Sequence, residues 1–78
     1  MVMSLSFEVS DKKIVEELAA REPIIRDALI SLLAAKSLDY VSDIANLESL
    51  RMQIKDTVNE YLKKGRVVRV YFTGYVLQ

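Results

Sequence analysis

The chain of 78 residues contains no cysteine, histidine or tryptophan, one proline and two glycines. Without cysteine there is no disulfide, no thiolate nucleophile and no cysteine-based zinc or iron–sulfur site. Without histidine there is no Ser–His or Cys–His catalytic arrangement, and the commonest metal ligand is missing. Gly65 and Gly74 alone do not make a glycine-rich phosphate loop. The composition therefore excludes much of enzyme chemistry, and we expect no cofactor.

An excess of one charge and a long hydrophobic run are also absent. Eleven Lys and Arg residues balance 11 Asp and Glu residues, and the pI is about 6.2. Such a chain has no overall field that attracts nucleic acid or an anionic membrane. The longest apolar stretch, residues 28–35, is interrupted by Ser31, whereas a membrane span needs about 20 residues. The N-terminus does not resemble a signal peptide.

Strand patterns occupy both ends of the chain. Residues 2–9 alternate in polarity, which predicts a half-buried strand with an inner face of Met3, Leu5, Phe7 and Val9. Residues 66–78 are rich in β-branched and aromatic side chains and predict a second strand. One face of it carries Val68, Val70 and Phe72, and the other carries Arg69, Tyr71 and Thr73. Gly74 predicts a bulge or a close backbone approach.

Helical patterns follow the first strand. Ser10 suits the N-cap of a helix over residues 11–21. Because Pro23 is unfavourable inside a helix but suits its first turn, we expect a kink at Arg21–Glu22 and a second helix over residues 23–36. The core face of this second helix comprises Ile24, Ile25, Ala28, Leu29, Leu32 and Ala35, with Leu33 at the boundary. The opposite face comprises Arg26, Asp27, Ile30 and Ala34.

A third helix is predicted over residues 43–64, capped by Ser42 or Asp43. Its core stripe comprises Leu47, Leu50, Ile54, Val58, Tyr61 and Leu62. The preceding connection, residues 37–42, is expected to be held against the body by Leu38, Tyr40 and Val41. The Lys-Lys-Gly sequence at residues 63–65 is typical of a helix C-terminus with a left-handed stop.

This order of elements predicts an α+β fold for a single domain of residues 1–78. A kinked helix pair and a third helix would pack on a small antiparallel sheet. Size scaling predicts a folded surface of about 4,800 Å² and a thin core. Two strands rarely make a stable sheet. We therefore expect a third strand, from residues outside this chain or from a neighbouring chain.

Three segments of the sequence carry a resemblance: the final strand Val70–Gln78 (VYFTGYVLQ), residues 17–36 (ELAAREPIIRDALISLLAAK) and residues 4–9 (SLSFEV). Together they resemble the flagellar basal-body-associated FliL family. The family has a similar strand, helix, proline, Ile-Arg-Asp sequence, apolar helix and lysine, and the resemblance covers essentially the whole chain. The sequence departs from the family at Gly74–Tyr75, where an acidic or polar residue and a phenylalanine are usual.

The resemblance implies a fold similar to the stomatin/prohibitin (SPFH) core and a non-enzymatic, structural role. It implies self-assembly into a ring that contacts flagellar stator subunits and supports motor output. It also implies a position on the periplasmic side of the bacterial inner membrane. The family has an N-terminal membrane helix, a linker and a further strand, so the chain is expected to be a truncated periplasmic domain.

Two groups of residues are candidates for an oligomer or partner interface. The first, on the second helix, consists of Arg26, Asp27, Ile30, Leu33 and Ala34. The second, on the final strand, consists of Arg69, Tyr71 and Thr73. Exposed apolar residues beside charges are typical of interfaces, although another segment of the same protein would cover such residues equally well.

The sequence also offers an alternative from another functional class. The segment Lys63–Tyr75 combines four cations with aromatic residues, as single-stranded nucleic-acid-binding segments do. A helix end followed by a packed strand explains the same residues, and the pI is far below that of a typical nucleic-acid-binding domain. The paired carboxylates, including Glu16 and Glu17, are expected to lie on solvated helix faces with lysine and arginine partners.

Overall fold

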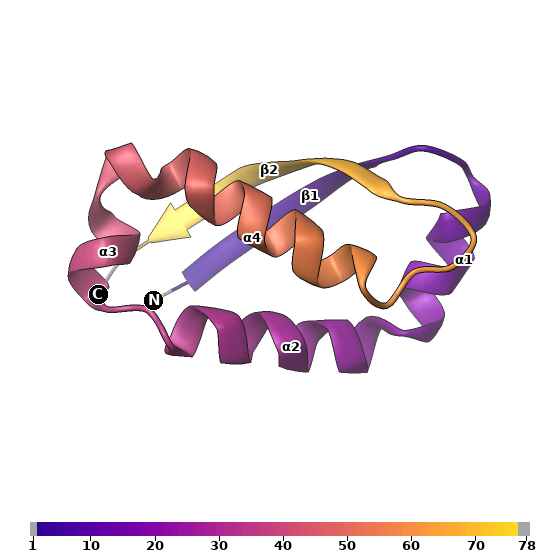
Figure 1. Cartoon of the computed structure of the whole chain (residues 1–78), viewed down its shortest axis with the longest axis horizontal. Helices are drawn as coiled ribbons and strands as arrows, with labels where there is room; N and C mark the ends of the chain where they lie inside the picture. Colours follow the sequence, from indigo (N-terminus) through magenta and orange to yellow (C-terminus); the bar gives the residue numbers. More distant parts are fainter. Residues whose placement is uncertain (1, 77–78) are drawn as a thin grey trace.

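The computed structural model describes residues 2–76. Its elements are β1 (Val2–Val9), α1 (Lys13–Ala20), α2 (Glu22–Ala34), α3 (Leu38–Ser42), the 3-10 turn η1 (Ile44–Asn46), α4 (Leu47–Asn59) and β2 (Val67–Val76) (Figure 1). The two strands form an antiparallel sheet. Helix α4 packs on β2, and α2 runs alongside α4 on the same side of the sheet (Figure 1). The α+β prediction is confirmed.

The pairing of the strands contains two irregularities. Phe7 lies opposite Val70 and Leu5 opposite Phe72, so the inner faces meet as predicted. Near the start of β2, however, Glu8 pairs with Arg69 and Val9 with Val67, which leaves Val68 as an extra residue. The prediction that Val68 shares a face with Val70 and Phe72 is therefore wrong. A bulge shifts the alternation by one residue, so Val67 is buried and Val68 is 41% exposed.

The second irregularity is beside Gly74, where the sequence predicted a bulge or a close approach. Ser4 pairs with Gly74 and Leu5 with Phe72, which leaves Thr73 without a partner in β1. A Cβ atom on Gly74 would lie 3.3 Å from Oγ of Ser4. The predicted bulge is confirmed as a register shift, and the atoms nearest to such a Cβ belong to the Ser4 side chain rather than to a backbone.

The first helices differ from the prediction at their ends. The break at Arg21 and the position of Pro23 in the first turn of α2 are confirmed. Ser10 is not an N-cap, because its hydroxyl accepts a hydrogen bond from the backbone N–H of Arg66 at 2.9 Å. The first turn of α1 is instead capped by Asp11, whose Oδ1 accepts from the N–H of Lys13 at 2.8 Å.

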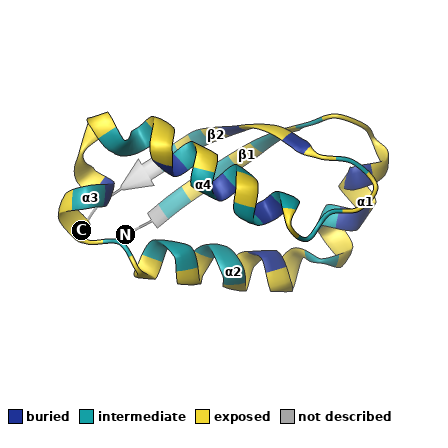
Figure 2. Ribbon diagram, in the orientation of Figure 1, coloured by how far each residue is buried: buried dark blue, intermediate teal, exposed yellow. Residues whose placement is uncertain are grey.

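Helix α2 contributes a narrower core face than predicted. Ile25 is buried, whereas Ile24 is 53% exposed and Ala35 is exposed. Successive residues are about 100° apart around a helix, so a face centred between Ile25 and Leu32 does not include Ile24 or Ala35. Figure 2 shows exposed and half-buried residues alternating along α2.

The region after α2 also departs from the prediction. The expected connection contains α3, whose cap is the Ser37 hydroxyl. Val41 is buried, but Leu38 is 59% exposed and does not hold the segment down. Helix α4 begins at Leu47 and ends at Asn59, so residues 63–65 lie outside it. No described residue has a positive φ angle, so the predicted left-handed stop at residue 65 is wrong.

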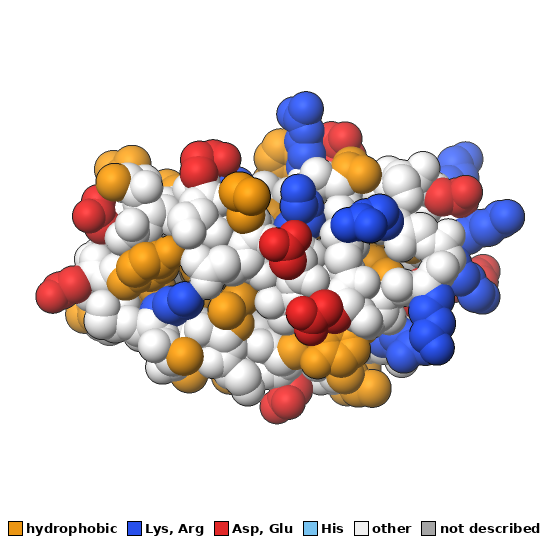
Figure 3. All heavy atoms as spheres, in the orientation of Figure 1, with side chains coloured by type: hydrophobic (Ala, Val, Ile, Leu, Met, Phe, Trp, Pro, Cys, Tyr) orange, Lys and Arg blue, Asp and Glu red, His pale blue; other side chains and the backbone are white. Residues whose placement is uncertain are grey.

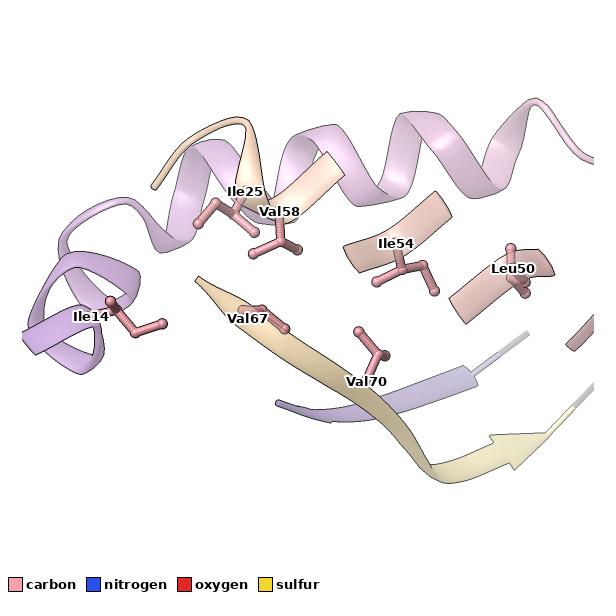
Figure 4. Close-up of a cluster of buried hydrophobic side chains, with 7 residues drawn as sticks. All are labelled: Ile14, Ile25, Leu50, Ile54, Val58, Val67 and Val70. Atoms are coloured by element: carbon pink, nitrogen blue, oxygen red, sulfur yellow. The ribbon is translucent and has the colours of Figure 1, made fainter. Parts of the chain in front are cut away.

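One hydrophobic cluster joins the elements. Its buried members are Ile14, Ile25, Leu50, Ile54, Val58, Val67 and Val70 (Figure 4). They come from α1, α2, α4 and β2 and point toward one another between the helices and the sheet. The predicted stripe of α4 is confirmed at its three buried positions, Leu50, Ile54 and Val58.

Candidate interaction surfaces

The predicted interface residues of α2 point in two directions: some line a groove and others point away from it. Arg26, Asp27, Ile30 and Ala34 are exposed, and Ile30 is 59% exposed despite its size. Leu33 is half-buried and packs against the core. Arg26, Ile30 and Leu33 line a groove beside β1, whereas Asp27 and Ala34 lie further round the helix, outside its lining.

This groove, which we call the α2–β1 groove, has a cavity volume of about 330 Å³. Its lining comprises Met3, Leu5 and Phe7 of β1 and Glu22, Ile25, Arg26, Leu29, Ile30 and Leu33 of α2. The floor is apolar, and an ion pair stands at the rim, where Nε of Arg26 donates to Oε1 of Glu22 at 2.6 Å. Met3, Leu5 and Phe7 are alternate residues, so the inner face of β1 forms this side of the groove.

A second groove lies between α4 and β2. This α4–β2 groove has a volume of about 400 Å³ and is lined by Glu48, Arg51, Met52, Lys55, Val68, Arg69, Val70 and Tyr71. Arg51 pairs with Glu48, and its guanidinium lies 5.2 Å from the centre of the Phe72 ring. The predicted residues Arg69 and Tyr71 belong to it, whereas Thr73 is exposed at the bulge outside its lining.

The sequence reasoning missed Glu17, which was expected to be solvated. Glu17 is only 8% exposed, and its Oε1 accepts hydrogen bonds from the N–H groups of Lys63 at 2.8 Å and Lys64 at 3.0 Å. The bond from Lys64, supported by that from Lys63 and by the Arg21 charge, lowers the pKa of Glu17 despite the opposing effect of burial. The sequence did contain a pattern that predicts the burial of Glu17, because Glu17 lies on the same helical face as the apolar residues Ile14 and Leu18.

Two further polar contacts fix the connection between α4 and β2. Asn59 donates from Nδ2 to the carbonyl of Val67 at 3.0 Å and accepts from the N–H of Val67 at 2.8 Å. Gly65 lies against Ile14, and a Cβ atom there would overlap Cγ2 of that side chain. The connection is therefore an anchored turn that sets where β2 begins.

The basic and aromatic residues of the alternative prediction do not form one surface. Phe72 packs toward the core, Lys63 and Lys64 lie at the turn beside α1, and Arg69 and Tyr71 lie on the outer side of β2. The Tyr71 hydroxyl donates to Oε1 of Glu8 at 2.9 Å.

Among residues 2–76, no three acidic residues are grouped as a metal site would require.

A family comparison decides what kind of protein has these surfaces. The model of the flagellar basal body-associated protein FliL family matches residues 1–78. The chain belongs to the FliL family. The match confirms the resemblance seen in the three sequence segments and supports a structural role at the flagellar basal body.

Two members of the FliL family are similar to the chain over most of its length. Flagellar protein FliL of Bacillus subtilis (strain 168) is 36% identical over 76 residues, which are 97% of this chain and 54% of that protein. Flagellar protein FliL of Aquifex aeolicus (strain VF5) is 32% identical over 76 residues, or 97% of this chain and 47% of that protein. The chain thus spans about half the length of these relatives.

In the part of the chain that the structure describes, no helix has the length and apolar character needed to cross a membrane.

Proposed function

We propose that this chain is the self-assembling domain of a non-enzymatic component of the bacterial flagellar basal body. In this role it forms an oligomeric ring that contacts stator subunits and supports motor output. The domain lies on the periplasmic side of the inner membrane and is anchored by a helix outside residues 1–78. The FliL family supports the basal-body role.

The observation that carries self-assembly is the α2–β1 groove. An apolar floor and a charged rim occur together there, as they do where a protein face is covered by another chain. A neighbouring protomer that occupied this groove would bury Ile30 and the β1 side chains that line it. Repeated head-to-tail, such a contact closes into a ring if the rotation per subunit allows it.

The test is the solution mass by light scattering, over a concentration series, of this chain and of a version extended to restore the membrane anchor. Discrete large assemblies are expected. Ile30→Asp should reduce their mass, because it places a charge over the apolar groove. Ile24→Asp is the matched control, since Ile24 is also exposed on α2 but lies outside the groove. Monomers from both versions, or equal effects of the two substitutions, would contradict self-assembly through this groove.

Stator contact requires a separate measurement. The assembled wild-type protein is expected to bind the periplasmic region of a stator subunit in a co-sedimentation experiment. Binding by assembled protein with none by a dissociated Ile30→Asp variant would agree with a ring that surrounds the stator. No binding by either would contradict the stator part of the proposal and leave self-assembly to be judged on mass alone.

A further inference from the structure

The α4–β2 groove differs from the α2–β1 groove in how its wall is built. Four consecutive residues, Val68 to Tyr71, line it. Side chains of consecutive strand residues point to opposite faces of a sheet, so a lining of four in a row means that the edge of β2 itself forms one wall. Within residues 2–76, β2 pairs only with β1, so this edge retains backbone groups that an added strand would satisfy.

The opposite wall is one face of α4. Glu48, Arg51, Met52 and Lys55 are spaced three, one and three residues apart, which places them on neighbouring turns of the same helical face. Met52 is 59% exposed and Tyr71 is 43% exposed. The bulge in β2 turns the Val68 side chain outward, so Val68 is a third exposed apolar residue in the groove lining. Apolar side chains thus lie between charged ones in the groove, and Figure 3 shows orange and blue side chains interspersed where α4 and β2 lie in Figure 1.

The charge of the groove is positive. Arg51, Lys55 and Arg69 face a single carboxylate, Glu48, which pairs with Arg51. Neither Lys55 nor Arg69 forms an ion pair within residues 2–76. Glu8, opposite Arg69 in the strand register, accepts its hydrogen bond from Tyr71 instead. Two cations beside an open strand edge therefore lack a partner, although the whole chain is neutral.

We propose that the α4–β2 groove binds an extended, acidic segment of a partner protein, which adds to the edge of β2 as a third strand. Its backbone would pair with residues 68–71, its acidic side chains would meet Lys55 and Arg69, and its apolar side chains would lie on Met52 and Val68. Cations on the edge discourage indiscriminate strand pairing, so they select for an acidic strand. The inference rests on the proposed function only in treating the chain as an interaction domain, and it does not require the ring.

The test uses a fluorescent peptide of about nine residues, alternating Glu with Val and Thr, added to the full chain in low salt. Binding by fluorescence anisotropy is expected, and the same peptide with Lys in place of Glu should not bind. A version with alternate amides N-methylated should also fail, because it keeps the charge but cannot pair with a strand edge. Binding that survives N-methylation, or equal competition by an oligonucleotide of similar charge, would overturn strand addition.

Charge-reversal variants locate the binding. Lys55→Glu combined with Arg69→Glu should weaken binding about tenfold or more, because each substitution replaces an attractive charge pair with a repulsive one. Lys13→Glu is the matched control, since Lys13 is exposed on α1 outside the groove, and it should leave affinity unchanged. Circular dichroism shows whether each variant is folded. Equal losses in both variants would overturn the assignment, while the mass measured in the same samples tests ring assembly separately.

Discussion

At the scale of single residues, Glu17 links two parts of the chain that are far apart in sequence. The carboxylate lies on an apolar helical face and joins α1 to residues 63–64, which are distant in sequence. A buried carboxylate is unfavourable unless it is hydrogen-bonded. Here two backbone N–H groups, those of Lys63 and Lys64, donate hydrogen bonds to the Glu17 carboxylate. The same bonds give these two N–H groups of the turn before β2 an acceptor.

The lowered pKa of Glu17 predicts an acid-dependent loss of stability. The folded state favours the charged form, so this stabilisation is complete above the ordinary value of 4.5 and is lost as pH falls through the lower folded pKa. Urea unfolding between pH 7 and pH 3 should show a falling midpoint for the wild type. Glu17→Gln should be less stable at pH 7 and should converge with the wild type in acid. Parallel curves would contradict the assignment.

Gly65 predicts a steric effect at the same turn. Gly65→Ala would press a methyl group into Ile14, and overpacking of this kind typically costs about 1–3 kcal/mol. The cost is measured as the change in free energy of unfolding. Gly74→Ala is the control, because among the described residues its Cβ would meet the Ser4 side chain at 3.3 Å or more, without the overlap found at Gly65. A smaller loss for Gly65→Ala than for Gly74→Ala would be inconsistent with the packing of the turn on α1.

At the scale of elements, the two bulges of β2 decide which side chains face outward. The strand keeps its inner pairs, such as Phe7 with Val70, but inserts Val68 and Thr73 between them. Bulges increase twist and bend a strand. They therefore let β2 follow α4 while turning Val68 toward the α4–β2 groove.

Helix α4 is expected to contribute most of its stability through its buried stripe. Ile54→Ala should cost about 2–5 kcal/mol in the free energy of unfolding, because it removes a fully buried side chain at the centre of the cluster. Ile44→Ala is the control, since Ile44 is 82% exposed and surface changes stay within about 0.5 kcal/mol. Similar losses at the two positions in urea unfolding would contradict the assigned helical face.

At the scale of the whole molecule, the chain covers its core only in part. The exposed surface of 5332 Å² is larger than the value of about 4,800 Å² expected for its mass. The molecule is elongated, with extents of 36 × 20 × 18 Å. Within residues 2–76, the two strand edges without a partner and the two grooves are surface that a further strand or a neighbouring protomer would cover.

Covering of the α2–β1 groove by another protomer predicts a concentration-dependent thermal stability. The wild-type melting temperature should rise by several degrees as protein concentration increases, because association stabilises the folded state. Ile30→Asp should retain the helical circular dichroism spectrum and lose this dependence. A wild-type melting temperature that does not change with concentration would argue against self-association, whatever the effect of the substitution.

Local patterns in the sequence were sufficient for the types and order of the main elements. The alternation over residues 2–9 and the stripe of α4 each reflect a period that depends only on neighbouring residues. The exposure of Ile30 followed from the same reasoning. The ends of helices were less predictable: Ser10 and residues 63–65 have the chemistry of caps, but contacts with distant residues occupy them instead.

The sequence by itself determined the fold class, the break before Pro23, the bulge beside Gly74 and membership of the FliL family. These properties follow from local backbone preferences and from residue patterns that can be read in order along the chain. Only the tertiary structure decided the burial of Glu17, the outward turn of Val68 and the grouping of Lys55 with Arg69. Each of these depends on two segments far apart in sequence that meet only when the core closes, so no local pattern specifies them.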